Sequence, residues 1–151
     1  MQGLETQSRD YVTHVVQNND IVYAFTSALN PDNTEFTEHL GRHGDGVRDV
    51  AFTVDDATGI YNKAVERGAT SVAEPKEFRD DNGAVIMASV KTYGDTIHTF
   101  VQRVDYKGPF LPGFAKHHLK ECFNELLPAT NLQFVDHCVG NQGDGEMEAA
   151  A

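Results

Sequence analysis

His137 is the residue of this sequence whose type and surroundings best suit chemistry. It lies in the alternating run NLQFVDHCVGNQ, at residues 131–142. Side chains alternate between the two faces of a strand, so Val135, His137 and Val139 would share one face. An imidazole among valines is either packed and hydrogen-bonded or bound to a metal, and the pattern alone favours packing. His137 therefore needs further ligands to become a metal site.

Other polar motifs have simpler explanations as turns. The run HGDG at residues 43–46 resembles part of a hydrolase oxyanion motif, but the chain has no GxSxG elbow. The run DDNG at residues 80–83 lacks the spacing of a calcium loop and suits a hairpin turn. His117 and His118 are adjacent and would diverge on a helix. The other histidines read as sheet or loop residues, namely His14, His98, His39 and His43.

Charge and hydropathy exclude several classes of partner. The chain has 23 acidic and 12 basic residues and a formal net charge of -11, which repels nucleic-acid phosphates and anionic lipids. No apolar run approaches the roughly 18 residues of a membrane-spanning helix, and the polar start MQGLETQSRDY does not match a signal peptide. Cys122 and Cys138 lack CxxC spacing and read as reduced thiols. We expect a cytoplasmic protein without nucleic-acid or membrane partners.

Hydrophobic periodicity predicts the strands and helices that would position these residues. Residues 9–28 predict a β-hairpin, and residues 28–46 a polar loop with no more than one helical turn. Residues 47–54 predict a strand, followed by a helix that an acidic residue caps and Gly68 ends. Three further strands joined by short turns follow, up to residue 104.

The order from 47 to 104 is βαβββ, an α+β unit in which four strands curl around a concave face and the helix covers the other. The hairpin at 9–28 looks like the last part of an equivalent unit. Residues 105–131 form a connector in which HHLKECFNELL predicts a short helix. Residues 132–139 then predict one more strand.

Seven motifs in consistent order resemble the 4-hydroxyphenylpyruvate dioxygenase family, closest to its animal form. The resemblance spans residues 3–148, and its motifs, which lie between residues 3 and 142, read GLETQSRDYVTHVV, FTSALNP, HGDGVRDVAF, RGA, KTYGDTIHT, FLPGF and VDHCVGNQ. This family belongs to the vicinal oxygen chelate superfamily, whose paired βαβββ modules wrap a metal. The resemblance implies that residues 1–104 are the metal-free module without its first strand and helix, that 105–131 are the connector, and that 132–151 begin the metal-bearing module.

The resemblance implies that His137 is the first of three Fe(II) ligands, with a second histidine and a glutamate farther downstream in family members. Fe(II) in oxygen chemistry takes two imidazoles and a carboxylate on one face, leaving positions open for substrate and dioxygen. Asp49 stands where the metal-bearing module is expected to have a histidine, and Thr99 where it is expected to have the glutamate. The unit at 47–104 is therefore expected to be the metal-free half, and the chain to be incomplete at both ends.

The activity that the resemblance implies is conversion of 4-hydroxyphenylpyruvate and O2 to homogentisate and CO2 in tyrosine and phenylalanine catabolism, by a complete enzyme that is a homo-oligomer. We expect this chain alone to be inactive. Two alternatives stay open: a dioxygenase like 4-hydroxymandelate synthase, and a non-catalytic module or pseudo-subunit. The unpaired edges of the hairpin and of the strand at 132–139 predict association.

Overall fold

The computed structural model describes residues 1–119 and 122–150 and divides into two compact units. One unit comprises Met1–Glu38 and Gly113–Val139, and the other comprises His39–Pro112 and Gly140–Ala151. In this division residues 113–131 of the predicted connector and the predicted final strand fall with the N-terminal hairpin, whereas residues 105–112 fall with the second unit.

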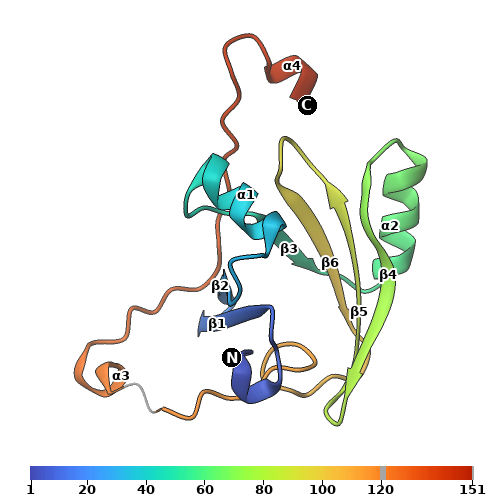
Figure 1. Cartoon of the computed structure of the whole chain (residues 1–151). Helices are drawn as coiled ribbons and strands as arrows, with labels where there is room; N and C mark the ends of the chain where they lie inside the picture. The colour runs from blue at the N-terminus through green and yellow to red at the C-terminus, as the bar shows by residue number, and fades with distance from the viewer. Residues whose placement is uncertain (120–121, 151) are drawn as a thin grey trace. The chain divides into compact units, whose positions relative to one another are not determined.

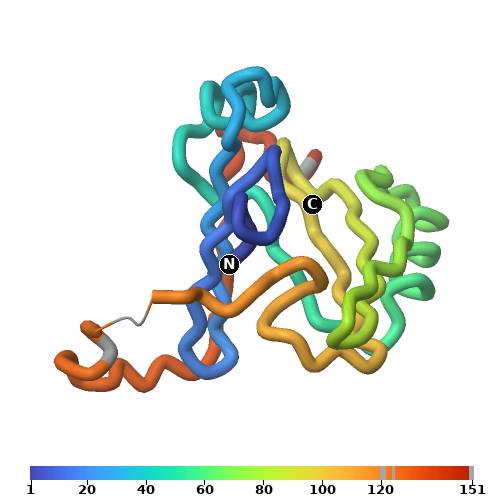
Figure 2. Tube along the Cα trace, turned by 60° about the horizontal axis from the view of Figure 1, so that its bottom comes forward, coloured from blue at the N-terminus to red at the C-terminus, as the bar shows by residue number. Residues whose placement is uncertain are grey.

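The second unit holds a four-stranded sheet covered by one helix, as predicted. The strand order is β3-β6-β5-β4, with β3 parallel to β6 and the other neighbours antiparallel. Figures 1 and 2 show the helix α2 along one side of this sheet. The elements in chain order are β3 Asp49–Thr53, α2 Ala57–Glu66, β4 Ser71–Asp80, β5 Gly83–Lys91 and β6 Ile97–Arg103.

The helix α2 begins and ends at the signals that its sequence carries. The Asp56 carboxylate accepts a hydrogen bond from the Gly59 N–H at 2.8 Å, and Gly68 takes a φ of 102° just beyond the helix. Tyr61 is 7% exposed and packs with Ala88 and Val90 of β5 to form the core cluster of the unit. This cluster joins α2 to the sheet.

A second helix, α1 Thr34–His43, occupies the stretch for which we predicted a loop. That prediction was wrong, and so was the placement of His39 and His43 in a loop. The Asn33 side chain accepts a hydrogen bond from the Phe36 N–H at 3.1 Å, which caps the first turn. Gly44 follows the last helical residue with a φ of 65°. These two end signals outweigh the polar composition of the segment.

The first unit is built on the predicted hairpin, β1 Tyr11–Asn18 and β2 Ile21–Ala28. Asn19 takes a φ of 51° in the two-residue turn, and a short 3-10 helix, η1 Leu4–Thr6, precedes β1. Several large apolar side chains of the hairpin remain exposed: Val16 at 54%, Tyr23 at 50% and Phe25 at 61%. The hairpin therefore leaves apolar surface that its own unit does not cover.

The predicted strand at 132–139 is not formed, and this expectation is corrected. The segment is extended, and two hydrogen bonds join it to the hairpin turn: the Asn19 side chain donates to the Leu132 carbonyl, and the Asp20 N–H donates to the Gln133 carbonyl at 3.0 Å. A strand needs a neighbouring ladder, and none runs beside this segment in the described part of the chain.

The connector helix is shorter than predicted. It is confined to α3 Phe123–Leu126, and residues 120–121 lie outside the described residues. A last short helix, α4, spans Met147–Ala150. His117 and His118 lie outside any helix with their rings stacked at a centroid distance of 5.0 Å, so they do not diverge as expected. Within the described residues, no helix combines the length and apolar character needed to cross a bilayer.

Because of its exposed apolar side chains, we expect the isolated chain to self-associate as its concentration rises. Val16, Tyr23 and Phe25 offer contact area at low entropic cost. Sedimentation velocity over a concentration series measures this directly. A single monomeric species at every concentration, with cooperative thermal unfolding, would contradict the expectation.

Candidate functional site

The candidate metal ligand His137 lies in the extended segment with its side chain 71% exposed. Its Nδ1 is 2.6 Å from Oδ2 of Asp136. An imidazole that donates its Nδ1–H to a carboxylate keeps the lone pair of Nε2 for a metal, which is a common arrangement around metal-binding histidines. The local geometry of His137 is thus compatible with ligation, but Asp136 is engaged with the ring rather than placed as a second ligand.

Asp49 and Thr99, the two other positions that the resemblance singled out, lie close together in the second unit. The Thr99 hydroxyl donates a hydrogen bond to Oδ2 of Asp49 at 2.6 Å. The Ser89 hydroxyl, 2.8 Å from that of Thr99, then donates to it. Ser89 and Thr99 are each 8% exposed and pair across β5 and β6. The three side chains form a polar chain of hydrogen bonds on the face of the sheet opposite α2.

Desolvation within the fold shifts the protonation of Asp49. The residue keeps exposed surface, but the protein displaces part of the water around its carboxyl, and this desolvation raises the pKa of Asp49 above its ordinary value. Hydrogen bonds from Thr99 and the charges of His98 and Arg48 act in the opposite direction and are smaller. Asp49 is thus held by the Thr99 hydroxyl, with its pKa set mainly by desolvation.

The described residues do not fit an Fe(II) site of two imidazoles and a carboxylate. Across residues 1–119 and 122–150, no three His, Cys, Asp or Glu side chains gather closely enough to hold a metal ion. Asp49 has the Thr99 hydroxyl, not an imidazole, as its hydrogen-bonding partner. His137 therefore stands without the rest of a coordination sphere in this part of the chain.

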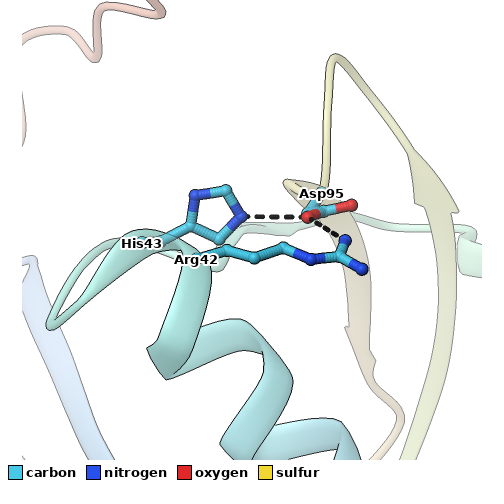
Figure 3. A network of polar contacts seen from close by, with 3 residues as sticks. All are labelled: Arg42, His43 and Asp95. Atoms are coloured by element: carbon cyan, nitrogen blue, oxygen red, sulfur yellow. Dashed lines mark hydrogen bonds and ion pairs between the residues drawn. The ribbon is translucent and has the colours of Figure 1, made fainter.

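A second polar network, which the sequence did not predict, joins α1 to the turn between β5 and β6. Oδ2 of Asp95 is 2.9 Å from Nε2 of His43 and 3.2 Å from a guanidinium nitrogen of Arg42, as Figure 3 shows. The hydrogen bond from His43, then that from Arg42, lowers the pKa of Asp95. All three side chains are substantially exposed, so the network adds little stability and mainly orients the turn.

Comparison with known proteins finds relatives of this chain. No family model matches it. It is 49% identical over 153 residues to 4-hydroxyphenylpyruvate dioxygenase of Tetrahymena thermophila, covering 99% of this chain and 38% of that protein. It is also 50% identical over 148 residues to the same enzyme of Caenorhabditis briggsae, covering 98% of this chain and 38% of the relative. This chain is a homologue of the 4-hydroxyphenylpyruvate dioxygenases.

The relation to 4-hydroxyphenylpyruvate dioxygenase covers nearly all of this chain but only part of the enzyme. The zebrafish relative, from Danio rerio, is 50% identical over 146 residues, which are 96% of this chain and 37% of that protein. The chain thus spans well under half the length of these dioxygenases. The resemblance that the seven motifs carried is confirmed.

Solved structures confirm the α+β fold with its βαβββ unit. A mutant of 4-hydroxymandelate synthase from Streptomyces coelicolor matches with a TM-score of 0.63 and 28% identity, over 74% of this chain and 31% of that one. Methylmalonyl-CoA epimerase from the same organism matches with a TM-score of 0.51 and 14% identity, over 67% of this chain and 74% of that one. The second likeness concerns the fold alone.

The raised pKa of Asp49 predicts how the stability of this dioxygenase homologue depends on pH. Because the folded pKa of Asp49 is raised, the folded state holds this proton more tightly than the unfolded state does. Asp49 therefore contributes most to stability at pH values below its pKa in the unfolded state. This contribution falls as the pH rises through its pKa in the folded state. We expect Asp49→Asn to gain stability relative to the natural chain as pH rises from about 3.5 to 7.

Urea unfolding of both proteins at each pH measures this difference, because ionisations common to both cancel. An Asp49→Asn protein that loses relative stability toward neutral pH would contradict the raised pKa.

Proposed function

We propose that this chain supplies the metal-free module and one metal ligand of an Fe(II)-dependent dioxygenase that converts 4-hydroxyphenylpyruvate and O2 to homogentisate and CO2. The observation that carries the proposal is the 49% identity to such an enzyme over 99% of the chain. In this proposal residues 1–104 form the metal-free module, 105–131 connect, and 132–151 begin the metal-bearing module. The complete enzyme is proposed to be a homo-oligomer.

His137 is the proposed iron ligand of this chain. Its support is the match of VDHCVGNQ to the family motif and the hydrogen bond that orients its ring toward Asp136. The described residues do not complete an iron site, so no catalytic step is assigned to them. Their proposed part is structural: a sheet with a polar chain where the metal-bearing module is expected to place ligands. The chain alone is proposed to be inactive.

Two other functions compete with this proposal. The likeness to 4-hydroxymandelate synthase, at a TM-score of 0.63, favours a dioxygenase that forms hydroxymandelate from the same keto acid. Its 28% identity is well below the 49% of the dioxygenase relative, which favours homogentisate as product. The incomplete ligand set instead favours a non-catalytic module.

Product analysis distinguishes these functions. The chain is assayed with Fe(II), ascorbate, O2 and 4-hydroxyphenylpyruvate, alone and co-expressed with the part of the Caenorhabditis briggsae relative that lies beyond the matched region. We expect no product from the chain alone and homogentisate from the pair. Hydroxymandelate would instead favour the synthase, and no product from a stably associated pair would favour the non-catalytic module.

Within the active pair, His137→Ala is expected to abolish turnover, because a facial triad that loses an imidazole cannot hold Fe(II) productively. The matched control is His118→Ala, which removes another exposed imidazole. Equal loss in both variants would argue against His137 as the ligand.

A further inference from the structure

The turn between β4 and β5 contains an asparagine followed directly by a glycine. Asn82 and Gly83 lie where this turn meets the start of β5 (Figure 1). Asn82 is exposed, and within the described residues no hydrogen bond holds its carboxamide. The carboxamide is therefore free to turn toward the peptide nitrogen of Gly83, the next residue in the chain.

The backbone of Asn82, unlike its side chain, is held on both sides. Its N–H donates a hydrogen bond to Oδ1 of Asp80 at 2.7 Å, and its carbonyl accepts one from the Lys107 N–H at 2.9 Å. When the peptide nitrogen of Gly83 loses its proton, negative charge spreads onto that carbonyl oxygen. The Lys107 N–H stabilises this charge, because a donor aimed at a developing anion is strongest when the charge forms.

The fold itself requires a glycine after Asn82. Gly83 has a φ of 122°, which side chains rarely allow, and a methyl group there would lie 2.6 Å from the carbonyl oxygen of Asp105. A glycine has no side chain to shield its peptide nitrogen from a neighbouring carboxamide. None of the other asparagines of this sequence precedes a glycine. The tight turn thus places the most reactive neighbour beside one asparagine alone.

We propose that Asn82 is a site of spontaneous deamidation in the folded chain. Solvent base removes the peptide proton of Gly83, and this nitrogen bonds to Cγ of Asn82 while the amide nitrogen leaves as ammonia. Water then opens the cyclic imide at either of its carbonyl carbons, which gives aspartate or isoaspartate. The reaction consumes only water and changes no oxidation state. All of its residues belong to the second unit, and it does not depend on the proposed function.

The products are expected to loosen the β4–β5 turn. Isoaspartate adds one carbon to the backbone of a two-residue connection, and Asp80 and Gly83 are the last paired residues on either side. The hydrogen bonds of the Asn82 backbone to Asp80 and Lys107 are then misaligned, which disturbs the pairing of the two strands. Both products also add a negative charge beside Asp80 and Asp81, and like charges repel.

Peptide mapping of the folded 151-residue chain tests the site. The chain is incubated at mildly alkaline pH in oxygen-labelled water and then digested with trypsin in ordinary water, so that only conversion before digestion carries the label. Cleavage after Arg79 and Lys91 releases residues 80–91 as one peptide. We expect this peptide to gain the mass of an amide converted to an acid, with the label, and to separate into two products.

The matched variant is Asn82→Gln, which keeps the carboxamide but would have to form a larger and less favourable ring. It is expected to yield no labelled product, and the peptides that carry the other asparagines are expected to stay unconverted over the same time. Circular dichroism before and after incubation shows that the chain stays folded. An unconverted 80–91 peptide in the folded chain, or equal conversion at the other asparagines, would overturn the proposal.

Thermal unfolding tests the consequence for the turn. The isoaspartyl chain, separated by its added charge and different backbone, is expected to melt at a lower temperature than the natural chain. Freshly purified Asn82→Asp carries the same charge without the extra backbone carbon, so we expect a smaller decrease. An isoaspartyl chain that melts with the natural chain, or no lower than Asn82→Asp, would contradict the role of the added carbon.

Discussion

Tyr61→Ala is expected to lower the free energy of unfolding of the sheet unit by about 3 to 4 kcal/mol. Tyr61 is 7% exposed and packs on Ala88 and Val90, the buried residues through which α2 meets β5. Its hydroxyl also donates to the Ser71 hydroxyl at 2.6 Å. Removing the ring leaves a cavity under α2 and removes this hydrogen bond, and both effects favour the unfolded state.

Tyr61→Phe is the matched control, because it removes only the hydroxyl and should cost about 1 kcal/mol. Urea unfolding followed by circular dichroism measures both variants. If Tyr61→Ala cost no more than Tyr61→Phe, the ring would not form the core of the unit. A loss of helical signal in Tyr61→Ala before the main transition would agree with α2 detaching first.

Gly83→Ala is expected to be the second most damaging change, at about 2 to 3 kcal/mol. Gly83 has a φ of 122°, a conformation that an L-residue adopts only with strain. A methyl group there would also lie 2.6 Å from the backbone carbonyl oxygen of Asp105. The side chain of Asp105 accepts a hydrogen bond from the Ala84 N–H at 2.8 Å, so the chain cannot retreat without losing that bond.

Gly41→Ala is the control for this substitution. Gly41 lies inside α1, and an added methyl group there would have nothing within 4 Å. It is expected to stabilise the helix by up to about 1 kcal/mol. Thermal and urea unfolding of both variants test the pair. A Gly83→Ala protein as stable as Gly41→Ala would contradict the tight backbone approach at the β4–β5 turn.

The βαβββ unit was predictable because its signals are local. The helix α2 carries a capping aspartate, Asp56, and a terminal glycine, Gly68, around a regular apolar stripe. The strands alternate, and the run DDNG between β4 and β5 makes a tight turn. Each of these features is decided within a few residues of chain, so the sequence alone specifies it.

The features that the sequence analysis missed have different causes. The helix α1 was taken for a loop because its composition is polar, although Asn33 and Gly44 mark its two ends. The segment at 132–139 alternates like a strand but has no ladder beside it in the described residues, so alternation alone was misleading. Nothing near Asp95 in sequence indicates its pairing with Arg42 and His43.

The candidate site was predicted in part. Asp49 and Thr99 were singled out from the resemblance, and the structure brings them within hydrogen-bonding distance. Ser89 was not foreseen, because its contact with Thr99 depends on the pairing register of β5 and β6.

Iron content is the measurement that tests the central claim most directly, namely that His137 is one ligand of an iron site that the described residues do not complete. The chain is purified anaerobically, incubated with Fe(II) and ascorbate, freed of unbound metal, and analysed for iron per polypeptide. We predict iron far below one atom per chain and no difference between the natural chain and His137→Ala. One tightly bound iron per chain, lost in His137→Ala, would contradict the account.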